Sequence, residues 1–355
     1  MVKKIIVCAP LPPPYGGIVN WYKILASQCK KHGYEIININ TSPRKTIDGR
    51  TIFYRVFVQG FRMLAQRREL GKIIKTNDVS AVHITTSGYF ALVRDILFMK
   101  RLKKKKKRSI YHIHFGRIPE IFARKGLEYH LLKRAISLAT EVIVIDPKTY
   151  DVLSKEYSTV VHYIPNPVDE VSIDDCKSSS TLLFLGNVLK TKGIDELLQA
   201  WENITDRYSD WSLTIAGFCE NEYKEYIEKH FSLKNVNFTG AVKHEDAIEM
   251  IKNSSFLVLP SYTEGFPNVV IEAMMCAKAV VATDVGAIAD ILDGNCGLVI
   301  QPQSVEELQN AMNKMIENPD MRLQMGSAGR EKALKQYASN VVFEQYSELW
   351  RGTNE

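Results

Sequence analysis

Residues 260–277 read PSYTEGFPNVVIEAMMCA, and the rest of the chain is organised around this stretch. It follows the apolar run 255–259 (SFLVL), which is typical of a buried strand. The chain then turns over residues 264–267 and enters an apolar helix; Pro267 suits the first turn of a helix, where its missing N–H would have had no partner. A strand that delivers a short loop to the start of a helix is a candidate anion site, because free N–H groups and about half a positive charge point outward there.

Two carboxylates bracket this candidate site. Glu264 lies just before the helix, and Glu272, eight residues on, lies within it. A single glutamate in such a place is more often a surface acid, a cap or a solvated helix residue, and that interpretation stays open for each one alone. An acid on a mostly apolar helix nevertheless needs a partner. The pair therefore marks a candidate polar site.

The segment EGFPNVVIEA, with Glu264 and Glu272 as the ends of the spacing, resembles the E-x7-E signature of retaining glycosyltransferases of family 4. The resemblance covers most of the chain and is strongest over residues 181–300. It implies the α/β fold called GT-B, in which two Rossmann-like domains with parallel sheets face each other across a cleft. It also implies that the C-terminal helix returns to the first domain.

The alternation of strand and helix patterns along the whole chain independently predicts parallel sheets with helices on both faces. Residues 164–169 (IPNPVD) resemble the I-P-N-G-V-D segment that closes the first domain in this family, with Pro167 in place of the usual glycine. We therefore expect an acceptor-binding domain at 1–166, a nucleotide-sugar-binding domain at 167–337 and a returning helix at 338–355. Among the helices, the pattern predicts one at 51–68 and one at 194–208.

The composition is that of a two-domain globular protein, with 355 residues of which 45% are hydrophobic and 24% charged. No apolar run reaches the roughly 18 residues of a transmembrane helix, and the start MVKKIIVCAP lacks the apolar region of a signal peptide. The six cysteines are scattered without a C-x-x-C pair, which is typical of buried thiols in a reducing compartment. We expect a cytoplasmic protein, associated peripherally with the inner face of the cell membrane for the reason that follows.

The net charge of +6 hides an asymmetry between the two halves. Residues 1–166 hold 30 Lys and Arg against 11 Asp and Glu, or +19, whereas residues 167–355 hold 16 against 29, or −13. The basic half should meet an anionic partner. The run 103–108 is as often a solvated loop, but here it adjoins an apolar and basic helix, which favours an anionic membrane surface. The residues expected at this membrane and acceptor surface are Arg55, Arg62, Lys103, Lys104, Lys105, Lys106, Lys107 and Arg108.

Glycines and histidines mark the first half as well. Gly16 and Gly17 allow close backbone approach at a helix start; in the family this resembles, such a pair lies beside the donor diphosphate and the acceptor, although a plain turn is the alternative. His112 and His114 share one face of the expected strand 109–115, because strand side chains alternate. His114 matches the family's first-domain histidine that reaches the transferred sugar. His112 is interpreted as a packed strand residue, and His83 stays undecided.

Residues 186–193 (GNVLKTKG) resemble the family's G-R-L-x-x-x-K-G segment. Lys192 matches the lysine that neutralises the departing diphosphate, whereas Asn187 stands where an arginine is usual, and Lys190 is a candidate substitute for the missing charge. Many glycosyltransferases of the other main fold hold a divalent metal with an Asp-x-Asp motif, which does not occur in this sequence. We therefore predict a site that requires no metal and no cofactor beyond the nucleotide-sugar substrate, with Lys192 and the helix beginning near Pro267 stabilising the leaving group.

The resemblance also implies roles for single residues. Glu272 would hold the donor ribose hydroxyls, and Glu264, His114 and Lys192 would be the catalytic residues. Glu264 and the backbone around Phe266, Pro267 and Asn268 would hold the transferred sugar, and the N–H groups of Val269 and Val270 would face the phosphates. The base would lie beside Gly240, Ala241 and Val242. Retention of the anomeric configuration, by attack on the face that the leaving group quits, is implied by the resemblance alone.

Together these features predict a retaining, metal-independent hexosyltransferase that moves a sugar from a UDP- or GDP-sugar to a membrane-proximal glycan acceptor. A polyprenyl-diphosphate-linked acceptor in cell-surface polysaccharide synthesis is the preferred reading. Two alternatives remain open. An epimerase of the same fold would act on the sugar nucleotide alone and would not need so basic a first domain. A non-enzymatic module could use its basic face to bind nucleic acid, but no nucleic-acid-binding signature accompanies the lysines, so we expect no nucleic-acid partner.

Overall fold

A computed structural model describes residues 3–12, 16–42, 52–157, 160–174 and 179–352, with only the backbone described over 52–57. The chain divides into two compact units. The first unit comprises Met1–Pro167 together with Ser339–Glu355, and the second comprises Val168–Ala338. These boundaries lie one residue after those suggested by the sequence.

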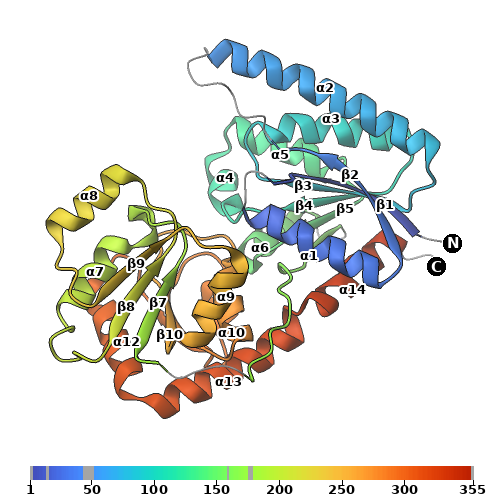
Figure 1. The fold of residues 1–355 in the computed structure, drawn as a ribbon. Helices are drawn as coiled ribbons and strands as arrows, with labels where there is room; N and C mark the ends of the chain where they lie inside the picture. The colour runs from blue at the N-terminus through green and yellow to red at the C-terminus, as the bar shows by residue number, and fades with distance from the viewer. Residues whose placement is uncertain (1–2, 13–15, 43–51, 158–159, 175–178, 353–355) are drawn as a thin grey trace. The chain divides into compact units, whose positions relative to one another are not determined.

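The first unit is built on a six-stranded sheet in the order β2-β1-β3-β4-β5-β6, and every neighbouring pair is parallel (Figure 1). Its strands are β1 (Lys3–Ala9), β2 (Tyr34–Asn40), β3 (Ala81–Thr86), β4 (Ser109–Ile113), β5 (Glu141–Val144) and β6 (Val161–Tyr163). Its helices are α1 (Gly17–Lys31), α2 (Ile52–Thr76), α3 (Ala91–Lys104), α4 (Ile118–Arg124), α5 (Leu127–Ile136), α6 (Pro147–Tyr157) and α14 (Ser339–Arg351).

Helices cover both faces of this sheet, as a parallel sheet requires. α2, α3 and α5 bury one apolar core against it, which includes Leu70, Phe98 and Leu132. α1 and α14 bury a second core on the opposite face, which includes Trp21 and Trp350 (Figure 1). The helix at the C-terminus of the chain is thus part of the first unit.

Helix α2 is longer than the sequence pattern indicates. We expected it to end at residue 68, but it continues to Thr76 because Leu70 and Ile74 point into the core. Gly71 does not break it. A Cβ at this position would overlap the Arg101 guanidinium, so the glycine lets α2 and α3 approach closely.

The second unit is built on another fully parallel six-stranded sheet, in the order β12-β11-β10-β7-β8-β9. Its strands are β7 (Thr181–Leu185), β8 (Ser212–Ala216), β9 (Val236–Gly240), β10 (Phe256–Leu259), β11 (Ala279–Thr283) and β12 (Gly297–Ile300). Its helices are η1 (Lys190–Lys192), α7 (Ile194–Glu202), α8 (Asn221–His230), α9 (His244–Asn253), α10 (Asn268–Met275), α11 (Ile288–Leu292), α12 (Val305–Glu317) and α13 (Pro319–Gln336).

Helix α7 is shorter than expected. The pattern predicts a helix to residue 208, but α7 ends at Glu202 and the chain continues in turns. Asn203 and Thr205 have low helix propensity. Trp201 anchors the end of the helix instead, because its indole N–H donates to the Lys234 carbonyl at 3.0 Å.

Each sheet reverses its strand order at one point, and ligands of such sheets bind at the carboxyl ends of the strands that flank this reversal. In the first unit the reversal falls between β1 and β3, and in the second between β7 and β10. The loops that follow β7 and β10 carry Lys192 and Glu264. The topology therefore brings these two sequence motifs to one edge of one sheet. No helix within the described ranges is long and apolar enough to cross a bilayer.

Candidate functional site

The two motifs of the second unit meet through an ion pair. The Lys192 Nζ lies 2.6 Å from the Glu264 Oε1, and the same oxygen accepts a hydrogen bond from the Ser261 hydroxyl at 2.7 Å. The two charged side chains are 26% and 12% exposed, so the pair is shielded and still reachable. It places a fixed positive and a fixed negative charge side by side at the reversal point of the sheet.

Two glycines allow the loops around this pair to pack against each other. Gly193 has a φ of +71° and lies so close to the Pro260 carbonyl that any Cβ would overlap it. Gly286 has a φ of +58° and lies equally close to the Glu264 carbonyl. The next residue, Ala287, donates its N–H to the Gly265 carbonyl at 3.1 Å. The position of Glu264 is therefore fixed by backbone contacts on both sides.

Helix α10 begins directly after this loop, with Pro267 as its N-cap residue and no acid in its first turn. Phe266 is buried, and Asn268 is the first helical residue. The Val270 N–H donates to the Pro267 carbonyl at 3.1 Å, so it is used inside the first turn. The expectation that Val270 offers its N–H to a ligand therefore needs correction, and Val269 remains the candidate of the two.

Glu272 lies on the buried side of α10 and is only 8% exposed. Its nearest charged neighbour is His244 at the start of α9, with 3.8 Å between Oε1 and Nδ1. Burial raises the pKa of the Glu272 carboxyl, and the charge of protonated His244 opposes this shift. A carboxylate held in this way is costly for the free protein and suited to a ligand that brings hydrogen-bond donors.

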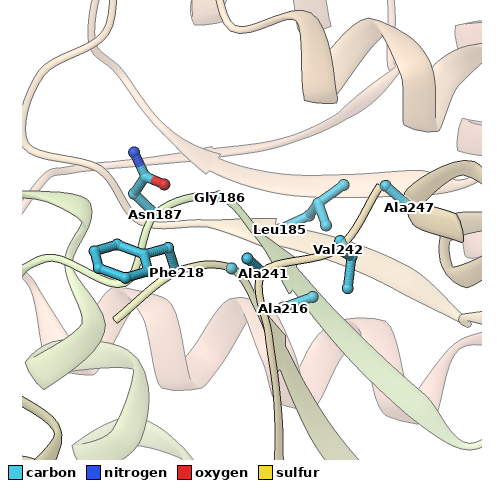
Figure 2. Close-up of a pocket in the computed structure, with 9 residues that line it drawn as sticks. Leu185, Gly186, Asn187, Ala216, Phe218, Ala241, Val242 and Ala247 are labelled. Carbon is cyan, nitrogen blue, oxygen red and sulfur yellow. The ribbon is translucent and has the colours of Figure 1, made fainter. Parts of the chain in front are cut away.

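A cavity of about 230 Å³ opens where β7, β8 and β9 end. Figure 2 shows its lining, which is mostly alkyl, with the amide of Asn187 and the ring of Phe218 as its functional groups. Two of the residues predicted to lie beside the base, Ala241 and Val242, line it. Gly240, the third, ends β9 with a φ of +71°, and its carbonyl accepts from Gly217 at 2.9 Å.

Sequence reasoning missed three residues of this edge. Phe218 is 56% exposed although it is a large aromatic residue, and it follows β8 directly. His244 faces Glu272, and Ser261 holds Glu264. Only Phe218 left a usable signal, because an apolar residue in a loop at the carboxyl end of a strand has no core to fill.

In the first unit, Gly16 and Gly17 form the start of α1 at the carboxyl end of β1. A Cβ at either position would meet no atom of the described residues within 4 Å, and Gly16 has an extended φ of 174°. Packing within the protein does not demand these glycines. They leave an open stretch of backbone at the reversal point of this sheet.

The three histidines singled out by the sequence lie together beneath α1 and α14. The ring of Trp21 lies with its centroid 5.1 Å from each of the rings of His83, His112 and His114. The rings of His112 and His114 are tilted by 34° to each other, with their centroids 3.8 Å apart. His112 is fully buried in β4, as the packed-residue interpretation expected, and His114 follows that strand and is partly exposed.

Hydrogen bonds fix which nitrogen carries the proton in two of these rings. The Trp350 indole, which can only donate, donates to the His83 Nδ1 at 3.1 Å. Burial lowers the pKa of His83 to about 3, so the neutral ring carries its proton on Nε2. That nitrogen lies 3.1 Å from the His112 Nδ1 and donates to it. His112 must therefore carry its own proton on Nε2.

Two ring nitrogens of this histidine cluster lack a hydrogen-bond partner among the described residues. Within the part of the chain that the structure describes, the Nε2 atoms of His112 and His114 are buried and accept or donate no hydrogen bond. Burial lowers the pKa of His114 to about 3, so its ring is neutral. His114 can thus serve as a hydrogen-bonding group but not as a standing positive charge.

The basic residues expected at a membrane surface lie in two places. Arg55 lies in the first part of α2, residues 52–57, whose side chains are not among those described. Arg62 is half-buried farther along the same helix. The run 103–108 lies at the opposite edge of the sheet, where β4 begins, and its lysines compensate the negative end of the α3 dipole. Lys103, Lys106, Lys107 and Arg108 line a cavity of about 400 Å³ there.

Arg108 differs from the lysines of this run. Its guanidinium donates to the Glu141 carboxylate and to the Leu349 carbonyl, each at 2.6 Å. It joins β4, β5 and α14 inside the first unit. The expectation that it faces a ligand or membrane is therefore corrected, and it acts as a structural residue.

The described residues contain no cluster of three or more His, Cys, Asp or Glu side chains that could hold a metal ion.

Two family models match the chain in succession. The model for Glycosyltransferase Family 4 matches residues 15–171, and the model for glycosyl transferases group 1 matches residues 175–332. The chain is a glycosyltransferase. The second match contains the Lys192–Glu264 pair, Glu272 and the cavity.

Relatives with this assignment differ in how much of this glycosyltransferase they cover. An uncharacterised glycosyltransferase of Methanocaldococcus jannaschii is 23% identical over 94% of both chains. A capsular polysaccharide biosynthesis glycosyltransferase of Staphylococcus aureus is 28% identical over 47% of this chain and 44% of its own. The N,N'-diacetylbacillosaminyl-diphospho-undecaprenol alpha-1,3-N-acetylgalactosaminyltransferase of Campylobacter jejuni is also 28% identical, over 48% of this chain and 44% of its own. With the last two, the match spans less than half of the relative's length.

Solved structures share the fold over nearly the whole chain. Anabaena HepE in complex with UDP covers 97% of this chain and 98% of its own with a TM-score of 0.73, at 16% identity. A glycosyltransferase of Rickettsia africae covers 99% of both with a TM-score of 0.76, also at 16% identity. The two parallel six-stranded sheets are thus those of the GT-B fold.

Proposed function

We propose that this glycosyltransferase takes its sugar from a nucleoside diphosphate donor, UDP- or GDP-linked, bound at the reversal point of the second sheet. The observation that carries the proposal is the Lys192–Glu264 pair at 2.6 Å beside the start of α10. In the free protein each charge neutralises the other. A donor supplies a diphosphate for the lysine and sugar hydroxyls for the glutamate, so both can be satisfied at once.

The remaining parts of the donor fit neighbouring groups. The base enters the cavity of about 230 Å³, where the Phe218 ring offers a stacking face and Asn187 an amide. Glu272 accepts hydrogen bonds from the ribose hydroxyls, which compensates a carboxylate that the free protein buries with His244 as its ion-pair partner. The Val269 N–H and the positive end of α10 face the phosphates. The transferred sugar lies against Glu264 and the backbone of residues 266–268.

The chemistry requires the bond between the anomeric carbon and the diphosphate oxygen to break while a bond to the acceptor oxygen forms. We propose that the new bond forms on the face that the leaving group quits, with retention, and that a phosphate oxygen takes the acceptor's proton. Negative charge then grows on the diphosphate. Lys192 and the α10 dipole stabilise it without a metal ion, and one such donor is typically worth about 3 kcal/mol. His114, as a neutral ring, is proposed to hydrogen-bond the transferred sugar.

The proposed acceptor is a lipid-linked glycan of cell-surface polysaccharide synthesis at the inner face of the cell membrane. Two relatives support this class by name, one assigned to capsular polysaccharide biosynthesis and one to a diphospho-undecaprenol-linked sugar. The balance of +19 over residues 1–166 suits an anionic bilayer. We propose that the first unit binds this acceptor.

A panel of nucleotide sugars, incubated with the enzyme in excess EDTA, tests the donor assignment through release of the nucleoside diphosphate. We expect one UDP- or GDP-sugar to be consumed. Lys192→Ala should lower turnover roughly a hundredfold, on the usual effect of a lost charge-stabilising group. Lys335→Ala is the matched control, because Lys335 also lies 2.6 Å from a glutamate oxygen, that of Glu331, but on the exposed surface of α13. It should leave turnover nearly unchanged.

Two results would contradict the proposal. Activity that disappears in EDTA and returns with manganese would refute the metal-free site. An equal loss in both lysine variants would show that Lys192 has no special place at the leaving group.

A further inference from the structure

Exposed apolar side chains of the first unit gather on three neighbouring helices. Among its described residues, Phe90 and Leu127 are each 77% exposed and Tyr89 is 65% exposed. Phe61, Leu64 and Val93 are the other large apolar side chains of this unit that are exposed among those described. All six belong to α2, to the start of α3 or to the start of α5, and none of those described lies on α1 or α14.

The backbone places these side chains at one corner of the unit. Phe90 and Val93 begin α3 at the carboxyl end of β3, where Arg94 donates to the Thr85 carbonyl at 3.2 Å. Leu127 begins α5, whose next residue, Glu128, accepts the Tyr89 N–H at 2.8 Å. Figure 1 shows α2 and α3 along the same side of the sheet.

Leu64 also lies near the carboxyl edge of the sheet. Gln66 of α2 donates to the Asn40 carbonyl at 2.7 Å, which fixes this part of α2 at the carboxyl end of β2. We name the set Leu64, Tyr89, Phe90, Val93 and Leu127 the apolar corner.

Contacts of Arg117 hold two parts of the apolar corner, Tyr89 and the start of α5, in place. The Arg117 guanidinium makes two hydrogen bonds of 2.7 Å with Glu128 and lies 3.7 Å over the Tyr89 ring. Tyr89 has a φ of +52°, a left-handed conformation that a residue with a side chain rarely adopts. The fold thus accepts strain to keep an aromatic residue at the surface, which a chance exposure would not require.

Charges surround the apolar corner in a pattern that suits a bilayer. Arg124 and Lys125 are exposed just before Leu127, and Arg68 is exposed one turn beyond Leu64. Glu69 and Glu120 are the exposed acids of the same segments. The exposed basic residues of these segments thus outnumber the acids by three to two, and apolar tips beside a small excess of cations suit the headgroup region of an anionic membrane.

We propose that the apolar corner inserts into the lipid bilayer and is the principal membrane contact of this protein. The proposal deepens the proposed function, since the lipid-linked acceptor lies in that bilayer. His114 donates its N–H to the Thr86 carbonyl at 3.1 Å, three residues before Tyr89, so insertion brings the His114 edge of the first unit to the headgroups. The lysine run 103–107, at the other end of α3, then contributes only salt-screened attraction.

Sedimentation with vesicles of phosphatidylglycerol and phosphatidylcholine tests this assignment. Leu127→Ser and Phe90→Ser should each weaken the partition roughly tenfold, from the lost burial of one large apolar side chain. Leu323→Ser is the matched control, because Leu323 is 71% exposed on α13 of the second unit, and it should bind as the wild type. Replacing Lys103–Lys107 with glutamine should reduce binding at low salt only.

A second measurement reports insertion directly. Tryptophan emission of Phe90→Trp should shift to the blue on vesicles and be quenched by brominated acyl chains, whereas Leu323→Trp should show neither effect. Donor binding and melting temperature, unchanged in Phe90→Ser, confirm that the variants fold.

Three outcomes overturn the proposal. The first is wild-type vesicle binding by the corner variants, and the second is an unshifted emission of Phe90→Trp. The third is a concentration-dependent dimer that Leu127→Ser dissolves, which would assign the corner to a second copy of the chain. The proposed function fails independently, if vesicles are bound normally but no nucleotide sugar is bound or consumed.

Discussion

At the scale of single residues, Glu272 illustrates how a binding group opposes stability. Its carboxylate is buried on an apolar helix beside one histidine, which raises its pKa in the folded protein. Between the ordinary pKa and this raised value, the unfolded chain loses its proton while the folded chain keeps it. Stability therefore falls as the pH rises through that window, and the loss persists above it.

Glu272→Gln should raise the melting temperature of the free protein at neutral pH. The amide removes the buried charge and keeps the shape of the side chain, so the gain over wild type should grow as the pH rises above about 4.5. Thermal unfolding of both proteins between pH 4 and 8 checks this. Glu225→Gln, an exposed glutamate of α8, should give no such pH-dependent gain. A lower melting temperature for Glu272→Gln across the range would mean that the carboxylate is well compensated in the free protein.

At the scale of elements, α14 does more than close the first core. It supplies Trp350, whose indole N–H sets the proton position in His83 and through it in His112. It also supplies Tyr346, whose hydroxyl accepts from the Trp21 indole at 3.0 Å. Helix α14 thus orients the His112 ring, which His114 contacts.

Trp350→Phe should release this control. Histidine-selective 15N spectra of the wild type should show His83 and His112 as neutral rings protonated on Nε2. The variant should show a mixture of forms, because the His83 Nδ1 no longer has a donor. Trp201→Phe is the matched control: it also removes a buried indole hydrogen bond, for a comparable cost of about 1 kcal/mol, but in the second unit. Unchanged histidine spectra in Trp350→Phe would show that Trp350 does not set the proton positions in His83 and His112.

At the scale of the whole molecule, most of the fold followed from local patterns. The alternation of strands and helices predicted the two parallel sheets, and the spacing of Glu264 and Glu272 pointed to the edge where the topology now places them. The predicted C-terminal ends of α2 and α7 were wrong, because burial of Ile74 and the turn at Asn203 depend on packing that no local pattern contains.

The candidate site was only partly predictable, for a related reason. Lys192 and Glu264 were identified separately, but their contact joins segments 72 residues apart. His244 was invisible because only the fold brings it to Glu272. The lysine run indicated a positive surface but not where that surface lies. The parallel sheet places the run at its amino edge, opposite His114, and Arg108 pairs with Glu141 inside the first unit.

Binding of a nucleoside diphosphate by the second unit through Glu272 is tested directly by calorimetric titration. Wild-type protein titrated with UDP and with GDP should bind one of them saturably. Glu272→Gln should bind that nucleotide at least about tenfold more weakly, since a hydrogen bond to a charged group contributes about 1.5–3 kcal/mol. Glu225→Gln should match the wild type. Equal affinity in wild type and Glu272→Gln, or binding of neither nucleotide, would contradict the account.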